Sequence, residues 1–223
     1  MSATLRTPIR GWRSSIILCD IIAVVIPIDG RDMSTRGFIG FVIDGTEKIA
    51  YNHFDSYPSA LGLNVLHWLH IEPQAEPDVV RERARALRVI VGNSEPTNED
   101  IERLQPFYNP NVGGHSDRPT WYQLLRETQG NPGLMLEAGV IEDASNFPLD
   151  SLFAEWGYIV DFDSGVFEVY QGFQQAPHDR GRFAGRESAG RRNSYYAVAL
   201  IASWPLVELP TDEAFIETLA EES

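Results

Sequence analysis

Residues 37–62 read GFIGFVIDGTEKIAYNHFDSYPSALG, and this stretch decides the predicted fold. Its first part, Gly37–Ile43, is rich in β-branched and aromatic residues, which favour a strand. Asp44-Gly45 is typical of a tight hairpin turn because both positions tolerate positive φ. Lys48–Tyr51 then returns as a second strand. Consecutive apolar residues in the first strand predict burial on both faces, so the hairpin belongs inside a layered fold.

A dense polar cluster follows the hairpin directly. It consists of Tyr51, Asn52, His53, Asp55, Ser56 and Tyr57. Pro58 favours an extended residue before it, and Ser59 is predicted to cap a helix that runs to about His70. Loops between rigid elements often carry binding groups, and a helix N-terminus adds exposed amides. Since Asn, Asp and Ser also form ordinary turns, both a structural role and a functional site stay open.

The rest of the chain predicts helices followed by strands. The predicted helices cover residues 78–91, 98–105, 121–128 and 134–138, and a last helix begins near Asp212. Trp156–Phe162 and Val166–Tyr170 flank a Gly-bearing turn and predict a second hairpin, and the apolar segment Tyr195–Ser203 predicts a central strand. Strands at both ends with a central helical region predict an α+β fold with a mainly antiparallel sheet.

Composition limits the partners of the protein. The 223 residues carry a formal net charge of -14, and this negative field disfavours nucleic acid and anionic membranes as partners. The single cysteine, Cys19, excludes an internal disulfide and a cysteine-based zinc site. These features predict a cytoplasmic protein. With nucleic acid and membranes disfavoured, a small-molecule ligand is the partner that the polar cluster would suit.

The first 32 residues differ from the rest. The apolar run 15–28 follows several arginines, but it is interrupted by Asp20 and is shorter than the ~20 residues of a spanning helix. No cleavage site of small residues follows it. Three interpretations stay open: a core strand, a non-native or mis-started extension, and a weak export signal. A start at Met33 would leave one globular domain over residues 33–223.

Residues 178–192 form a basic segment in an acidic protein, with five arginines among glycines. One interpretation is a solvated, partly disordered excursion. Another is a flap over an anionic ligand, in which Arg180 and Arg182 pair with carboxylate or phosphate. An RNA-binding segment is a third, which the acidic remainder of the chain opposes.

Common motifs for phosphate, dinucleotide and zinc-protease sites are absent from the sequence, as is the nucleophile elbow of hydrolases. His67 and His70 have a spacing that can bind a metal, but no third ligand is marked. We therefore expect no metal and no cofactor.

The layout resembles that of amidohydrolases with an N-terminal nucleophile, whose mature chain begins with Ser, Thr or Cys on the first strand of a hairpin. Processing at Met33 would expose Ser34 just before that strand, with its free α-amine as the base. Asn52 and Asp55 would then orient the nucleophile and donate to an oxyanion.

A closer resemblance is to a group of uncharacterised proteins of bacteria, phages and fungi. Thr35-Arg36-Gly37 and the stretch from Tyr51 to Gly62 match their signature, and the likeness extends through the hairpin of residues 156–170. The resemblance implies that the domain starts near Met33, and it brings no activity with it.

Two functional hypotheses follow. The first is an enzyme that acts on a small polar or anionic substrate at the Asn52–Tyr57 turn. In it His53 or the Ser34 amine is the base, Asn52 and Asp55 assist, and substrate contacts come from Tyr51, Ser56, Tyr57, Arg180 and Arg182. The second is a non-catalytic module that uses the same turn to bind a ligand or another protein.

Overall fold

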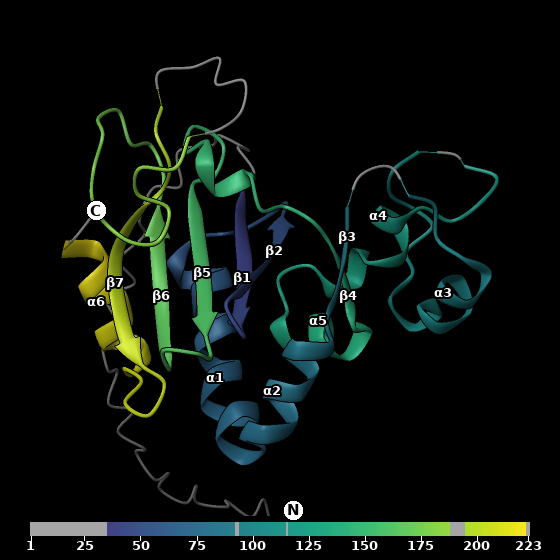
Figure 1. The fold of residues 1–223 in the computed structure, drawn as a ribbon, viewed down its shortest axis with the longest axis horizontal. Helices are drawn as coiled ribbons and strands as arrows, with labels where there is room; N and C mark the ends of the chain where they lie inside the picture. Colours follow the sequence, from purple (N-terminus) through teal and green to yellow (C-terminus); the bar gives the residue numbers. More distant parts are fainter. Residues whose placement is uncertain (1–34, 92–93, 115, 188–194, 222–223) are drawn as a thin grey trace, which may run out of the picture. The chain divides into compact units, whose positions relative to one another are not determined.

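The computed structural model describes residues 35–91, 94–114, 116–187 and 195–221 (Figure 1). The chain divides into two units, Met1–Asp32 and Met33–Ser223, and every described residue lies in the second. The three interpretations of the first 32 residues, and Ser34, therefore lie outside the described residues.

A five-stranded sheet in the order β2-β1-β5-β6-β7 forms the centre of this unit (Figure 1). The strands are β1 (Gly37–Ile43), β2 (Thr46–Asn52), β5 (Trp156–Asp161), β6 (Val166–Gln171) and β7 (Ala199–Pro205). The β1–β5 pair is parallel, and the other three pairs are antiparallel. The predicted α+β fold with a mainly antiparallel sheet is thus confirmed.

The first hairpin forms as its sequence predicts. Asp44 and Gly45 adopt φ values of 51° and 72°, which the tight turn requires. Every residue of β1 is buried, in agreement with its continuous apolar sequence. The register pairs Gly37 with Asn52, so the polar turn that follows β2 lies beside the beginning of β1.

Helices cover one side of the sheet, here called the helix face. They are the π-helical turn η1 (Pro58–Gly62), α1 (Leu63–Ala75), α2 (Pro77–Ala86), α5 (Pro132–Ala138) and α6 (Asp212–Glu221). Ile39, Phe41 and Val160 of the sheet pack with side chains of these helices in one buried cluster. Gly62 permits this packing, because a Cβ there would lie 3.0 Å from ring atoms of Tyr158 and Phe215.

Irregular segments cover the other side, here called the loop face. Phe38, Ile159 and Tyr170 of the sheet pack there against Leu149 of the 3₁₀ turn η4 (Phe147–Leu149) and against Phe183. Both faces of the central strands are therefore buried.

A smaller cluster surrounds a second, two-stranded parallel sheet of β3 (Arg88–Ile90) and β4 (Val140–Glu142). Its other elements are α3 (Asn98–Arg103), η2 (Gln105–Phe107), α4 (Trp121–Leu124) and η3 (Arg126–Thr128). Capping boxes at Thr97 and Thr120 begin α3 and α4.

Two predicted helices end differently from expectation. The predicted helix 78–91 is wrong after Ala86, because Leu87 leaves helical geometry at ψ 114° and residues 88–90 pair with β4. The predicted helix 121–128 divides into α4 and the 3₁₀ turn η3 at Leu125.

Two further expectations also need correction. Ser59 lies inside η1 and does not cap the helix, since the residue before η1 is Tyr57 and its side chain makes no capping hydrogen bond. The last strand, β7, lies at an edge of the sheet and not at its centre. The apolar residues just before it, Ala197 and Val198, are buried by the loop-face cluster instead.

Candidate functional site

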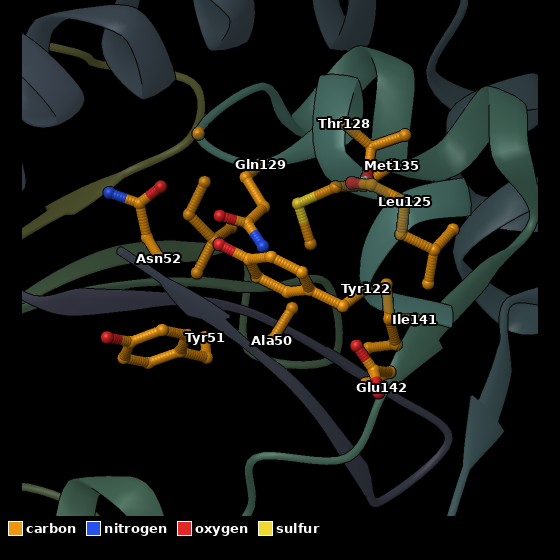
Figure 2. A pocket seen from close by; sticks show the side chains of 12 residues that line it. Ala50, Tyr51, Asn52, Tyr122, Leu125, Thr128, Gln129, Met135, Ile141 and Glu142 are labelled. Carbon is orange, nitrogen blue, oxygen red and sulfur yellow. Dashed lines mark hydrogen bonds between the residues drawn. The ribbon is translucent and has the colours of Figure 1, made fainter. Parts of the chain in front are cut away.

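The polar cluster at the end of β2 is divided between the two faces of the sheet, because successive residues of a strand point to opposite sides. The Tyr51 ring packs on the loop face, 4.9 Å from the Phe147 ring between centroids. Ala50 packs with the helix-face cluster. Asn52, two residues after Ala50, also points to the helix face, where it lines a cavity with Tyr122 and Gln129 (Figure 2).

His53 is paired with Tyr51. The Tyr51 hydroxyl lies 2.8 Å from Nδ1 of His53, and the His53 ring meets the Phe54 ring edge-on at 4.2 Å. Partial burial lowers the pKa of His53, and the positive charges of Arg126 and Arg36 lower it further. Burial likewise raises the pKa of Tyr51. Both shifts favour the neutral forms, so this pair is uncharged at neutral pH.

Asn52 and Ser56 hold the turn together. The Asn52 amide nitrogen donates to the Phe54 carbonyl and, at 2.8 Å, to the Ser56 hydroxyl oxygen. Ser56 is fully buried, its backbone N–H donates to the Thr35 carbonyl, and its own carbonyl accepts from the Tyr158 hydroxyl at 2.9 Å. These two side chains therefore have a structural role, although Asn52 also borders a cavity.

Asp55 and Tyr57 are exposed. Asp55 adopts a left-handed φ of 50°, and its carbonyl accepts the N–H of Leu61. The Asp55 side chain lines a hollow beside β2, and Tyr57 precedes η1. The turn thus presents one carboxylate and one phenol to solvent.

Three hollows meet at the end of β2. The inner cavity, of about 70 Å³, lies on the helix face between β2 and residues 122–135. The outer hollow, of about 460 Å³, is lined by Asp55, Arg126 and Glu127, and it shares Asn52, Gln129 and Gly130 with the inner cavity. The loop-face hollow, of about 530 Å³, is lined by Tyr51 and Arg36 among others.

Two arginines approach His53 from different elements. Arg126 of η3 lies over the Phe54 ring at 4.9 Å and donates to the Gln129 side-chain oxygen at 2.6 Å. Arg36, just before β1, lies over the Phe153 ring at 5.7 Å. Among the residues that the structure describes, neither guanidinium forms an ion pair with a carboxylate. Two positive charges thus stay available beside the histidine.

The arginine-rich segment is placed elsewhere. Arg182 pairs at 2.7 Å with both Glu168 and Asp161 on the loop face, and Phe183 is fully buried there. Arg180 donates to Gln174 at 3.3 Å. Neither arginine lines the three hollows at β2, and Arg191 and Arg192 lie outside the described residues. Arg182 and Phe183 thus anchor the described part of the segment to the sheet, while residues 185–187 are exposed.

The two helical histidines have other partners. His67 Nε2 lies 2.8 Å from Asp212 Oδ2, and His70 Nε2 lies 3.1 Å from the Pro210 carbonyl. In the described part of the chain, no three His, Cys, Asp or Glu side chains gather in a way that could hold a metal ion. Within the same residues, no helix has both the length and the apolar character needed to cross a bilayer.

Sequence reasoning missed most of the wall opposite β2. Tyr122, Arg126 and Gln129 come from a segment predicted only as a helix and its end, and Glu142 comes from an unpredicted strand. Glu142 reaches solvent on one side, but the groups around its carboxylate desolvate it and raise its pKa. No local pattern marks these residues, since only the fold brings them to β2.

No protein-family model, no curated protein and no solved structure matches the chain. The resemblance of Thr35–Gly37 and Tyr51–Gly62 to uncharacterised proteins stays a prediction. The function must therefore be argued from the site itself.

Proposed function

We propose that the protein is a hydrolase of a small anionic substrate and that His53 is its general base. The observation that carries this proposal is the position of His53, which is hydrogen-bonded to Tyr51 and stands in the chain between Asn52 and Phe54, two residues that line the outer hollow. The positive charges of Arg126 and Arg36 are near enough to lower its pKa. A titratable side chain with a shifted pKa beside surface hollows is a reasonable candidate for a functional group.

The chemistry follows from the protonation of His53. Its lowered pKa keeps the imidazole neutral at pH 7, which a general base requires. In the tautomer in which Nδ1–H donates to the Tyr51 oxygen, Nε2 is the basic nitrogen of the ring, and in this proposal it takes the proton from water. The Arg126 guanidinium in the outer hollow would bind the carboxylate or phosphate of the substrate, since its fork geometry suits both anions, and Arg36 in the loop-face hollow adds a second positive charge.

Water is the nucleophile in this proposal. The Ser56 hydroxyl is buried and accepts a hydrogen bond from Asn52, so it supports the turn and does not face the substrate. Catalysis by an N-terminal nucleophile at Ser34 would be a different mechanism, and Ser34 lies outside the described part of the chain.

Turnover by the full chain tests the proposal. Small esters and amides that carry a carboxylate or phosphate would be incubated with the protein, and products would be followed by NMR. His53→Ala should lower the rate of any turnover by about 100-fold or more. His70→Ala is the matched control, because His70 is exposed, lies near the Pro210 carbonyl and lines none of the three hollows at β2. Equal rates in His53→Ala and wild type would refute His53 as the base.

One observation favours a non-catalytic alternative. Asn52 and Ser56, two of the groups that could assist a reaction, are used to hold the turn. A protein that only binds an anion needs the two arginines and the hollow, but it needs no base. Saturable binding of a carboxylate without any product from a broad substrate panel would support this alternative.

A further inference from the structure

The inner cavity has polar groups at its two ends and apolar walls between them. Its apolar walls are formed mainly by Ile39, Ala50, Leu125, Met135 and Ile141. Figure 2 shows Asn52 near one end and Glu142 near the other, with the Tyr122 ring and the Met135 side chain between them. A site with this pattern suits a molecule that is polar at both ends and apolar in its middle.

The first end connects to the anion-binding groups. Gln129 lines both the inner cavity and the outer hollow, and its side-chain oxygen accepts from Arg126 at 2.6 Å. A carboxylate bound by Arg126 would therefore lie at the entrance of the inner cavity. Asp55 and Glu127 also line the outer hollow, so Arg126 is the group there that can attract an anion.

The second end carries a carboxylate without a described counterion. Glu142, the last residue of β4, lines the inner cavity and also reaches solvent, and its carboxylate has no hydrogen-bond or ion-pair partner among the residues that the structure describes. A partly desolvated carboxylate in this position gains from a ligand that brings a positive charge or a hydrogen-bond donor. The groups around this carboxylate desolvate it and raise its pKa, although Glu142 still reaches solvent on one side.

The size of the cavity limits the spacer. Its volume is about 70 Å³, whereas a single water needs roughly 10–15 Å³. The space therefore favours a slender chain of a few heavy atoms over a branched or aromatic group.

We propose that the ligand of this site is a short, unbranched molecule with an anionic group at one end and an amine at the other. The anionic group binds Arg126, the apolar chain fills the inner cavity, and the amine pairs with Glu142. This inference rests on the proposed function, because it takes the anion site from it.

The test compares, on the full-length protein, two probes that share a five-carbon acid chain and differ in a terminal amine. Binding of 5-aminopentanoate and of pentanoate would be followed by NMR, through the signals of Tyr122, Gln129 and His53. Wild type should bind 5-aminopentanoate about tenfold more tightly than pentanoate, and Glu142→Gln should remove this preference without weakening pentanoate. Glu95→Gln is the matched control, because Glu95 lines a neighbouring hollow but not the inner cavity.

A second variant guards against a folding defect in the first. Ala50→Ile suits a strand and places a larger side chain in the inner cavity, so it should abolish the amine preference while pentanoate still shifts His53. Equal affinities of the two probes for wild type would overturn the inference and leave the anion site standing. If neither probe shifts His53, the proposed function fails, and this inference fails with it.

Discussion

The Tyr51 hydroxyl lies 2.8 Å from Nδ1 of His53. Tyr51 is the second-to-last residue of β2, and His53 is the first residue after the strand. This spacing of two residues places both on the same side of β2. The strand therefore fixes the imidazole before any ligand arrives. Orientation of a base by a neighbouring hydrogen bond is a common feature of catalytic sites.

Removal of the Tyr51 hydroxyl should release the histidine. In Tyr51→Phe we expect turnover or anion affinity to fall about tenfold, because one hydrogen bond of about 1 kcal/mol no longer selects the imidazole orientation and tautomer. The ¹⁵N shifts of His53 report the tautomer directly. A Tyr57→Phe variant is the control, since Tyr57 is exposed and precedes η1. Unchanged His53 ¹⁵N shifts in Tyr51→Phe would show that the bond has no such role.

The pH dependence of His53 gives a second prediction. Burial and the charges of Arg126 and Arg36 lower its pKa from the ordinary 6.5, so the neutral base persists below that pH. Activity should therefore fall with acid only below pH 6.5. Arg126→Gln removes one positive charge and should move this acid limb upward, toward 6.5. Arg118→Gln serves as the control, because Arg118 contacts Pro96 and Asn98 instead. A limb that stays in place, or moves down, in Arg126→Gln would contradict this account.

The buried ion pairs of the loop face should govern acid stability. Burial tends to raise the pKa of Asp161, but hydrogen bonds from Ser164 and Arg182 outweigh it and lower the pKa below the ordinary 3.8. Its contribution to stability is thus complete above pH 3.8 and is lost as the pH falls through the lowered value. Arg182→Met should cost about 3 kcal/mol at neutral pH, because it leaves carboxylates unpaired, and acid unfolding should begin at higher pH.

Urea unfolding at several pH values measures this effect. Arg180→Met is the matched control, since Arg180 lies in the same segment but makes a 3.3 Å contact with Gln174 and no ion pair in the described chain. Equal loss of stability in both variants would mean that the charge network does not hold the segment.

Lys48 is the only lysine of the chain, and it caps a helix. Its buried ammonium donates to the carbonyls of Ala84, Arg85 and Leu87 at the end of α2. Lys48→Met keeps the apolar stem but removes these donors, so we expect a loss of about 2 kcal/mol in the free energy of unfolding. Denaturant titration measures it, with Arg83→Met on the exposed surface of α2 as the control. Full stability of Lys48→Met would exclude the capping role.

The strong local signals of the sequence predicted most of the sheet. Asp44-Gly45 and the Gly-bearing turn before Val166 specify hairpins through backbone conformations that few residues adopt, so both appear where expected. Arg88–Ile90 could not be predicted as a strand, because three residues carry no periodicity and only the pairing with Val140–Glu142 makes them one.

The site was also predictable only in part, because local sequence marks the turn but not the residues that the fold brings to it. The density of polar groups from Tyr51 to Tyr57 pointed to the right turn, yet Asn52 and Ser56 serve the backbone there. Arg126 lies more than seventy positions from His53 in the sequence, and no spacing rule links them. Arg182 looked like a free cation in the sequence, but its partners Glu168 and Asp161 lie on strands that only the fold places beside it.

The most direct test of the account is the response of His53 to an anion. The full chain would be titrated with pentanoate at several pH values, and the His53 Cε1–H signal would be followed by NMR. We predict a saturable shift and a rise in the pKa of His53, because a bound anion favours the imidazolium, and we predict that the Arg36→Gln/Arg126→Gln double variant loses both. A His53 signal that does not move, or that moves equally in the double variant, would contradict the central claim that these residues form an anion site.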